Sequence, residues 1–144
     1  MKDMLQARPY SHLIEQLKSA GLRPTKQRLA LARLLFAQGD RHTTAEQLHC
    51  QAMDAGVGVS LATVYNTLHQ FTTAGLLREV MVDPGRSYFD TNTSDHHHFF
   101  IEERGELKDI PGAAIEIAKL PEAPEGTTVR QVDIIIRVGQ SKSA

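Results

Sequence analysis

A change of hydrophobic period after Gly75 constrains this 144-residue chain more than any other feature. Before Gly75, apolar residues recur every three or four positions, which is typical of one face of a helix. After Gly75 they alternate, and Asp83-Pro84-Gly85-Arg86 is a strong turn signal between two predicted strands. Three or four helices followed by a two-stranded hairpin are typical of a winged helix-turn-helix.

Each predicted helix has a polar residue or a Pro-Thr pair at its start and a glycine near its end. The third also has the spacing of a capping box, from Thr44 to Gln47. Leu31, Leu34 and Leu35 are expected to form the buried stripe of the second helix. In chain order, the four predicted helices start at Ser11, Pro24-Thr25, Thr44 and Ser60, and they end at Gly21, Gly39, Gly56 and Gly75.

The fourth helix, Leu61 to Ala74, is the predicted DNA reader. Its apolar residues Leu61, Val64, Leu68 and Phe71 recur at spacings of three and four, so they are expected to be buried. Its opposite face is polar and uncharged, and amide and small side chains suit the reading of base edges in a major groove. Arginines at the start of the second helix and at the hairpin tip suit phosphate contacts, although such arginines are also common on a solvated surface. The DNA-binding candidates are therefore Arg23, Arg28, Thr63, Tyr65, Asn66, Gln70 and Arg86.

The remaining residues predict a small β-β-α-β half. A strand containing the histidine run His96–His98 is followed by a turn at Arg104-Gly105 and a returning strand. Pro111 is expected to start a helix with an apolar face of Ala114, Ile115 and Ala118, and Val129 to Val138 is the expected last strand. About fifty residues make a small core, which pairing with a second copy would complete. The predicted fold class is α+β, with a winged helix-turn-helix domain over residues 1–91 and a small α/β dimerisation and ligand-sensing domain over residues 92–144.

Three adjacent histidines, His96, His97 and His98, lie close to the carboxylates Asp90 and Asp95. Imidazole and carboxylate are ligands for borderline divalent metals, and imidazole also binds haem iron. In a strand, His96 and His98 point to one face and His97 to the other, so a single metal ion must take further ligands from elsewhere. The alternative is a solvated polar turn with a chance run of histidines.

Composition adds three constraints. Residues 1–90 carry ten Lys/Arg against eight Asp/Glu, and residues 91–144 carry six against nine, so a basic half is joined to an acidic one. The single cysteine, Cys50, excludes an intramolecular disulfide and a four-cysteine zinc site. With no apolar run of membrane-spanning length and no secretory signal, we expect a cytoplasmic protein without a membrane partner.

Several segments resemble the ferric uptake regulator family. They are Gly21-Leu22-Arg23-Pro24-Thr25-Lys26-Gln27-Arg28, Thr44-Ala45-Glu46-Gln47-Leu48, Ser60-Leu61-Ala62-Thr63-Val64-Tyr65 and Asp95-His96-His97-His98. The resemblance covers nearly the whole chain. It implies a homodimeric, metal-responsive transcription factor that binds double-stranded operator DNA.

The departures from the family pattern affect the metal sites. The two Cys-x-x-Cys pairs that hold a structural zinc in many members are missing, and so are a later histidine of the His run and a histidine in the last strand. The remaining metal-ligand candidates are His42, Asp90, His96, His97, His98 and Glu116.

An intact His triplet without the cysteines resembles the iron response regulator branch of the family, which senses haem. That resemblance implies a regulator of iron-homeostasis genes that releases its operators when haem binds His96, His97 or His98. The following residues, Phe99, Phe100 and Ile101, would offer an apolar surface for the macrocycle. A Cys-Pro haem motif is missing, because Cys50 precedes Gln51. Mn²⁺ or Fe²⁺ would be held by His97 with His42 and Asp90, at the junction of the two parts.

Other functions stay open. One alternative is a repressor of the same family that responds to Mn, Fe or Zn without sensing haem. A metalloenzyme is a second, because three histidines with an open position also describe catalytic zinc sites, although no nucleophile–base pair or His-Glu-x-x-His helix is visible. A regulator whose histidines bind no metal is a third.

Overall fold

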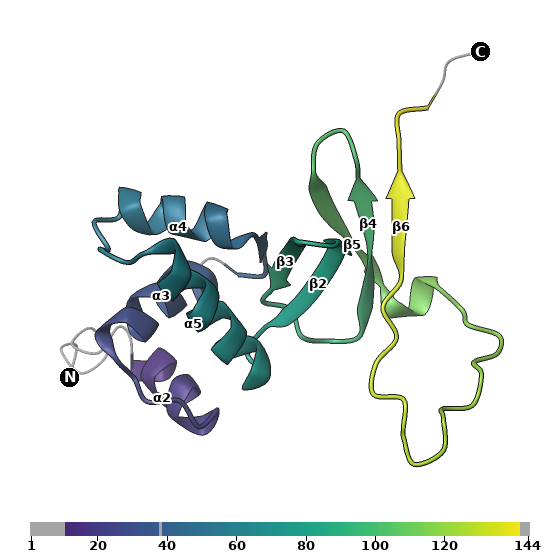
Figure 1. Cartoon of the computed structure of the whole chain (residues 1–144), viewed down its shortest axis with the longest axis horizontal. Coiled ribbons are helices and arrows are strands. Elements are labelled where there is room, and N and C mark those ends of the chain that lie inside the picture. Colours follow the sequence, from purple (N-terminus) through teal and green to yellow (C-terminus); the bar gives the residue numbers. More distant parts are fainter. Residues whose placement is uncertain (1–10, 38, 142–144) are drawn as a thin grey trace, which may run out of the picture. The chain divides into compact units, whose positions relative to one another are not determined.

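The computed structural model describes residues 11–37 and 39–141. By contacts the chain divides between Thr93 and Ser94 into two compact units, here called unit 1 (up to Thr93) and unit 2 (from Ser94). Each is described by itself. The fold is α+β, with the helices in unit 1 and a small sheet in each unit (Figure 1).

The described residues of unit 1 include four helices: α2 (Ser11–Ser19), α3 (Lys26–Phe36), α4 (Ala45–Asp54) and α5 (Leu61–Thr73). The predicted caps of α3, α4 and α5 are confirmed, since the side chains of Thr25, Thr44 and Ser60 accept the N–H of the residue three positions on, and Thr44 with Gln47 forms the full capping box. Gly75 follows α5 with a φ of 83°, a backbone conformation that residues other than glycine rarely adopt.

The wing of unit 1 is a three-stranded sheet in the order β1-β3-β2. Strands β2 (Arg78–Asp83) and β3 (Arg86–Asp90) form the predicted hairpin, turning at Gly85 with a φ of 81°. The sequence did not indicate β1 (His42–Thr43), which pairs antiparallel with β3 and places His42 opposite Asp90. Two residues are too few to show a period, so only the pairing with β3 reveals this strand.

The core of unit 1 lies between α3, α4 and α5 and is closed by Leu17, Leu77 and Phe89. On α5 the predicted stripe is confirmed for Val64, Leu68 and Phe71. It is wrong for Leu61, which is 36% exposed because it is the first residue of the helix and lies at the edge of the core. On α3, Leu31 and Leu35 are buried as expected, whereas Leu34 is only half-buried.

Unit 2 is built on a sheet in the order β5-β4-β6. Strand β4 (His96–Ile101) pairs antiparallel with β5 (Glu106–Pro111) and parallel with β6 (Ile135–Val138). The predicted alternation of the histidines is confirmed, because His96 and His98 are buried and His97 is half-buried.

The predicted helix after Pro111 is wrong. Only a 3-10 turn, η1 (Gly112–Ala114), forms there, and the chain then runs as a long loop to β6 (Figure 1). A glycine and two β-branched residues, Ile115 and Ile117, weaken helix propensity between Pro111 and Pro121, and so short a helix is marginal without packing.

The last strand is shorter than the predicted Val129 to Val138. Its pairing with β4 runs only from Ile135 opposite His98 to Val138 opposite Ile101. Before that, the Ile134 N–H donates to the side chain of His97 rather than to a backbone carbonyl, so the ladder begins late.

Candidate metal and nucleic-acid sites

Two buried imidazoles and one carboxylate converge in unit 2. Asp109 on β5 lies opposite His98 on β4 in the strand register. Its Oδ1 is 3.5 Å from His96 Nε2 and 3.3 Å from His98 Nε2. The two imidazole rings lie edge to face with centroids 4.6 Å apart, and both side chains are nearly inaccessible to solvent. We call His96, His98 and Asp109 the unit 2 triad.

The hydrogen bonding of His96 defines which nitrogen it presents to the triad. Its Nδ1 lies 2.6 Å from the Ser94 carbonyl oxygen, which can only accept, so Nδ1 carries the hydrogen. In the neutral ring, Nε2 then presents a lone pair toward the Asp109 carboxylate, which is also an acceptor. A metal ion between the imidazole nitrogen and the carboxylate oxygen would be bound by both acceptors. Fixing a ring through its other nitrogen is the arrangement that metal-binding histidines use.

Unit 1 carries a second pair of possible ligands. His42 Nε2 on β1 lies 3.2 Å from Asp90 Oδ2 on β3, and Asp90 is fully buried. The other carboxylate oxygen, Oδ1, accepts the Asn92 N–H at 2.8 Å. On the far side of β3, the register places the buried Arg78 opposite Asp90. A buried carboxylate is costly unless compensated, and this one has an imidazole and a backbone N–H beside it.

The remaining predicted ligands do not join these groups. His97 lies on the other face of β4, and its Nδ1 accepts the Ile134 N–H at 3.2 Å, so that nitrogen is not available to a metal. Glu116 is exposed in the loop after η1. Sequence reasoning missed Asp109, although a signal existed: a hairpin turning at Arg104-Gly105 brings Asp109 opposite His98 by counting alone.

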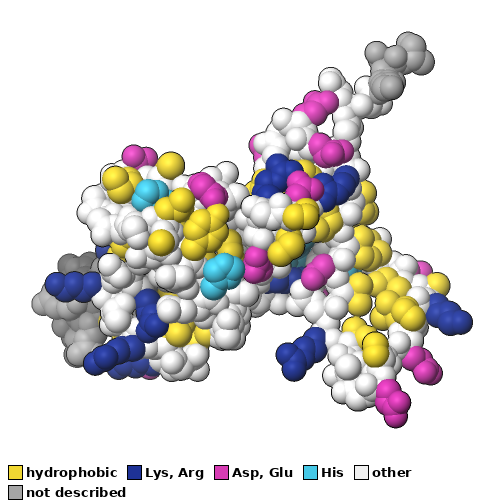
Figure 2. All heavy atoms as spheres, in the orientation of Figure 1, with side chains coloured by type: hydrophobic (Ala, Val, Ile, Leu, Met, Phe, Trp, Pro, Cys, Tyr) yellow, Lys and Arg dark blue, Asp and Glu magenta, His cyan; other side chains and the backbone are white. Residues whose placement is uncertain are grey.

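The outward face of α5 is polar, as predicted. Asn66 and Gln70 are exposed and Thr63 is partly exposed. Gln70 Oε1 accepts from Arg28 Nε at 3.3 Å and from Nη2 at 3.1 Å, and Arg28 Nη1 donates to the Arg23 carbonyl at 3.0 Å. These contacts fix Arg28 of α3 beside α5. Figure 2 shows lysine and arginine side chains on the side of unit 1 that carries α2 and α3.

The other two DNA-binding candidates are engaged in local contacts. Tyr65 donates its hydroxyl hydrogen to Glu46 of α4, and this hydrogen bond raises the pKa of Tyr65 above its ordinary value. Arg86 at the hairpin tip forms an ion pair with Asp83. Binding of a phosphate by Arg86 would have to compete with that carboxylate.

Comparison with known proteins identifies the family. The sequence model described as the ferric uptake regulator family matches residues 19–137. The chain belongs to the ferric uptake regulator family. It is similar to the ferric uptake regulation protein of Pseudomonas aeruginosa, with 37% identity over 102 residues that cover 70% of this chain and 76% of that protein. It also resembles the peroxide-responsive repressor PerR of Staphylococcus aureus, with 34% identity over 97 residues that cover 67% and 65%.

Solved structures of the family agree with this fold. The ferric uptake regulator from Pseudomonas aeruginosa with manganese matches at a TM-score of 0.69 and 29% identity, over 89% of this chain and 97% of that one. The Vibrio cholerae ferric uptake regulator matches at a TM-score of 0.68 and 23% identity, over 89% and 99%. Family membership supports a role as a regulator of transcription. Within the described ranges, no helix is long and apolar enough to cross a membrane.

Proposed function

We propose that this chain is a metal-responsive transcription regulator that binds double-stranded DNA through α5 and holds a divalent metal ion at the unit 2 triad. The convergence of His96, His98 and Asp109 is the observation that carries the metal assignment. Membership of the ferric uptake regulator family supports the regulatory role.

The donor set fits Mn²⁺, Fe²⁺ or Zn²⁺, since all three accept imidazole and carboxylate ligands. A bound ion would supply positive charge among the three acceptors of the triad. A related structure contains manganese. With Cys50 as the only cysteine, a four-cysteine zinc site is excluded for this sequence.

His42 and Asp90 offer one imidazole and one carboxylate of the same chemistry in unit 1. Three protein ligands leave open coordination positions on most divalent ions, so an ion at the unit 2 triad can bind further ligands. That a single ion takes ligands from both units remains a prediction. A metal titration of His42→Gln tests it, because metal affinity should fall although the triad is unchanged.

DNA reading is assigned to α5 and its neighbour Arg28. The helix presents Asn66 and Gln70 to solvent, and amides of this kind pair with adenine in the major groove. The Arg28 guanidinium, held against Gln70, would bind a phosphate or a guanine.

Pairing of two copies is assigned to unit 2. Large apolar side chains stay exposed there, and Figure 2 shows them gathered over the loop that precedes β6. A second copy meeting the same surface would bury them in an isologous dimer. The exposed residues are Ile117, Leu120, Val129 and Ile136.

A metal-binding titration read by DNA affinity tests the proposal. A DNA sequence is first selected from a random pool by the purified protein with Mn²⁺, and its binding is then followed by fluorescence anisotropy with and without the ion. We expect selection of a palindromic site whose binding depends on Mn²⁺. Equal recovery of all sequences in both conditions would refute the assignment.

Haem sensing, and with it placement in the iron response regulator branch, stays a prediction. Of the expected apolar platform, Phe100 is buried, while Phe99 and Ile101 are only partly exposed. Titration with haem in place of Mn²⁺ separates the two readings. Replacement of His96, His97 and His98 together by Ala should remove any haem-dependent Soret shift and any haem effect on DNA affinity. Persistence of both in the triple variant would place a haem site elsewhere.

A further inference from the structure

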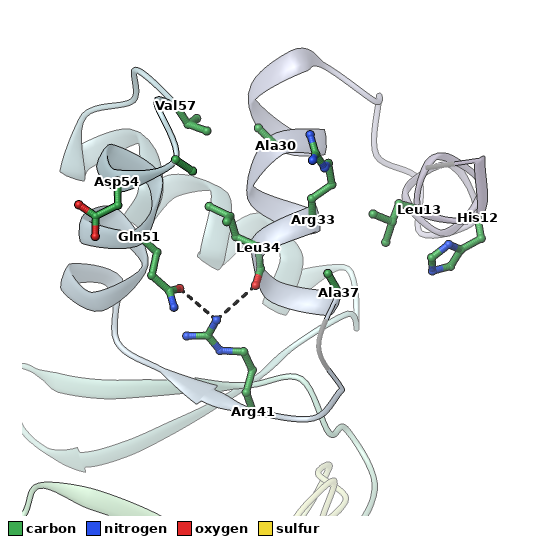
Figure 3. A pocket seen from close by; sticks show the side chains of 11 residues that line it. His12, Leu13, Ala30, Arg33, Leu34, Ala37, Arg41, Gln51, Asp54 and Val57 are labelled. Atoms are coloured by element: carbon green, nitrogen blue, oxygen red, sulfur yellow. Dashed lines mark hydrogen bonds between the residues drawn. The ribbon is translucent and has the colours of Figure 1, made fainter. Parts of the chain in front are cut away.

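A cavity of about 790 Å³ lies in unit 1 between α2, α3 and α4, apart from the metal and DNA sites (Figure 3). Its volume is typical of a site for a small organic molecule. Aliphatic residues form about half of its wall, and polar or charged residues form the rest. The aliphatic lining residues are Leu13, Ala30, Leu34, Ala37, Ala55 and Val57.

Arg41 closes one end of the cavity. Its Nη1 donates to the Leu34 carbonyl at 3.2 Å and to Gln51 Oε1 at 3.0 Å, and these two bonds hold the guanidinium in place (Figure 3). Within the described residues, Nε and Nη2 of Arg41 make no hydrogen bond. Burial lowers the pKa of Arg41, which reflects the cost of placing this cation away from water. A partly desolvated, pre-positioned guanidinium with donors remaining is suited to an anion.

The other polar residues at the cavity define what kind of anion fits. Arg33 and His12 add a second cation and a hydrogen-bonding ring, whereas Asp54 places an exposed carboxylate at the rim. The Asp54 carboxylate would repel an ion that carries several negative charges more strongly than one that carries a single charge. A single carboxylate needs only the Arg41 end, and its carbon chain can lie against the wall. We propose that this cavity binds a small organic carboxylate with an apolar body.

The backbone of Arg41 connects the cavity to the His42–Asp90 pair. The Arg41 N–H donates to Thr91 Oγ1 at 2.9 Å, and the Thr91 N–H donates to the Arg41 carbonyl at 3.1 Å. His42 is the next residue after Arg41, and Asp90 immediately precedes Thr91. A ligand that holds the Arg41 side chain therefore acts on the two strands that carry these donors. This part rests on the proposed function, and it makes the carboxylate an effector of metal binding.

Binding is tested on the full-length, metal-free protein with hexanoate, acetate and inorganic phosphate, by calorimetry and by NMR shifts of residues that line the cavity. Hexanoate should bind with shifts centred on Arg41 and Gln51, acetate more weakly, and phosphate not measurably. Tighter binding of phosphate than of hexanoate would overturn the carboxylate assignment. Equal, weak binding of all three would show that the cavity has no preference for an organic carboxylate, and it would also overturn the proposal.

Two variants and a control locate the site. Arg41→Gln should weaken hexanoate binding roughly tenfold or more, because a charge-assisted hydrogen bond is lost. Arg41 also makes hydrogen bonds that stabilise the fold, so its replacement could weaken binding indirectly. Ala30→Phe is therefore a second variant, which fills the cavity with a larger side chain and changes no charge. Lys18→Gln is the matched control, because it removes a cation of α2 that does not line the cavity. Unchanged hexanoate binding in Ala30→Phe would overturn the proposal.

The link to the metal is measured separately, as the Mn²⁺ affinity with and without saturating hexanoate. A change of severalfold is expected in wild type and none in Ala30→Phe. The same Mn²⁺ affinity in both conditions would overturn the link while leaving the carboxylate site standing. If the protein binds no Mn²⁺ at all, the proposed function fails, and the hexanoate result on metal-free protein is unaffected.

Discussion

The two units differ in how much core each holds. All but two of the buried hydrophobic side chains found in the described part of the chain belong to unit 1, and the two in unit 2 are Phe100 and Ile110. Unit 2 instead buries His96 and His98 and leaves Ile117, Leu120, Val129 and Ile136 exposed.

This contrast indicates different sources of stability. Unit 1 can be stabilised by its own hydrophobic core, because its helices bury one face against one another. About fifty residues with two buried hydrophobic side chains are too few to form a stable core in unit 2. We infer that unit 2 depends on what it binds, a metal ion at its triad and a second copy on its apolar surface. A sensor should be built in this way, since binding then changes its stability most.

The largest expected effect is the loss of the core of unit 1. Phe71→Ala removes a fully buried ring from α5 and should lower the free energy of unfolding by about 3–5 kcal/mol. Ile117→Ala in unit 2, where the side chain is 42% exposed, should change it by less than about 0.5 kcal/mol when the protein is monomeric. Urea denaturation measures both. Similar losses for the two variants would remove the contrast between the units.

Metal binding should stabilise unit 2 through its triad. Asp109→Asn removes the only carboxylate of the triad and should weaken Mn²⁺ binding by roughly 100-fold, since loss of even an outer-shell partner costs 10–100-fold. Asp133→Asn is the control, an exposed carboxylate of unit 2 outside the triad. Calorimetric titration with Mn²⁺ gives the affinities, and wild-type affinity in Asp109→Asn would exclude this carboxylate as a ligand.

The direct contacts with DNA should come from unit 1. Arg28→Gln removes the cation held beside Gln70 and should weaken DNA binding about fivefold, with the salt dependence of the logarithm of affinity falling by about one. Arg104→Gln, an exposed cation of unit 2, should leave both unchanged. Anisotropy at several salt concentrations distinguishes them. If Arg104→Gln had the larger effect, DNA would not be read through α3 and α5.

The smallest expected effect concerns the start of α4. Thr44→Ala removes the side-chain half of the capping box, the bond that Thr44 Oγ1 accepts from the Gln47 N–H, and should cost about 1 kcal/mol of stability. Thr44→Ser keeps the hydroxyl and should be close to wild type. Thermal unfolding measures the difference, and equal melting temperatures for the two variants would show that the cap does not limit the stability of unit 1.

Local signals explain why unit 1 was predicted well. Thr25, Thr44 and Ser60 each bond within three residues of themselves, so the information that starts α3, α4 and α5 lies in a short stretch of sequence. The alternation of His96 and His98 is equally local. Features set by distant partners were missed. Strand β1 exists only by pairing with β3, and β6 starts only where it meets β4.

The site shows the same division. The histidines and Asp90 were predicted from residue type and spacing, and the structure brings His42 to Asp90 across strands that are 48 residues apart, through β1, which was not predicted. Asp109 required the hairpin register, and Glu116 was chosen on a helix that does not form. Predicting the loop from Ile115 to Ile134 would require knowing what covers its apolar side chains.

The central claim is that a metal ion at the unit 2 triad controls the DNA affinity of unit 1. The direct measurement is the affinity for the selected DNA, with and without Mn²⁺, of wild type and of His98→Gln. Wild type should change its affinity by about tenfold or more, within the usual range of coupling between sites. His98→Gln should bind DNA at the metal-free level in both conditions. A full response to Mn²⁺ in His98→Gln, or no response in wild type, would contradict the account.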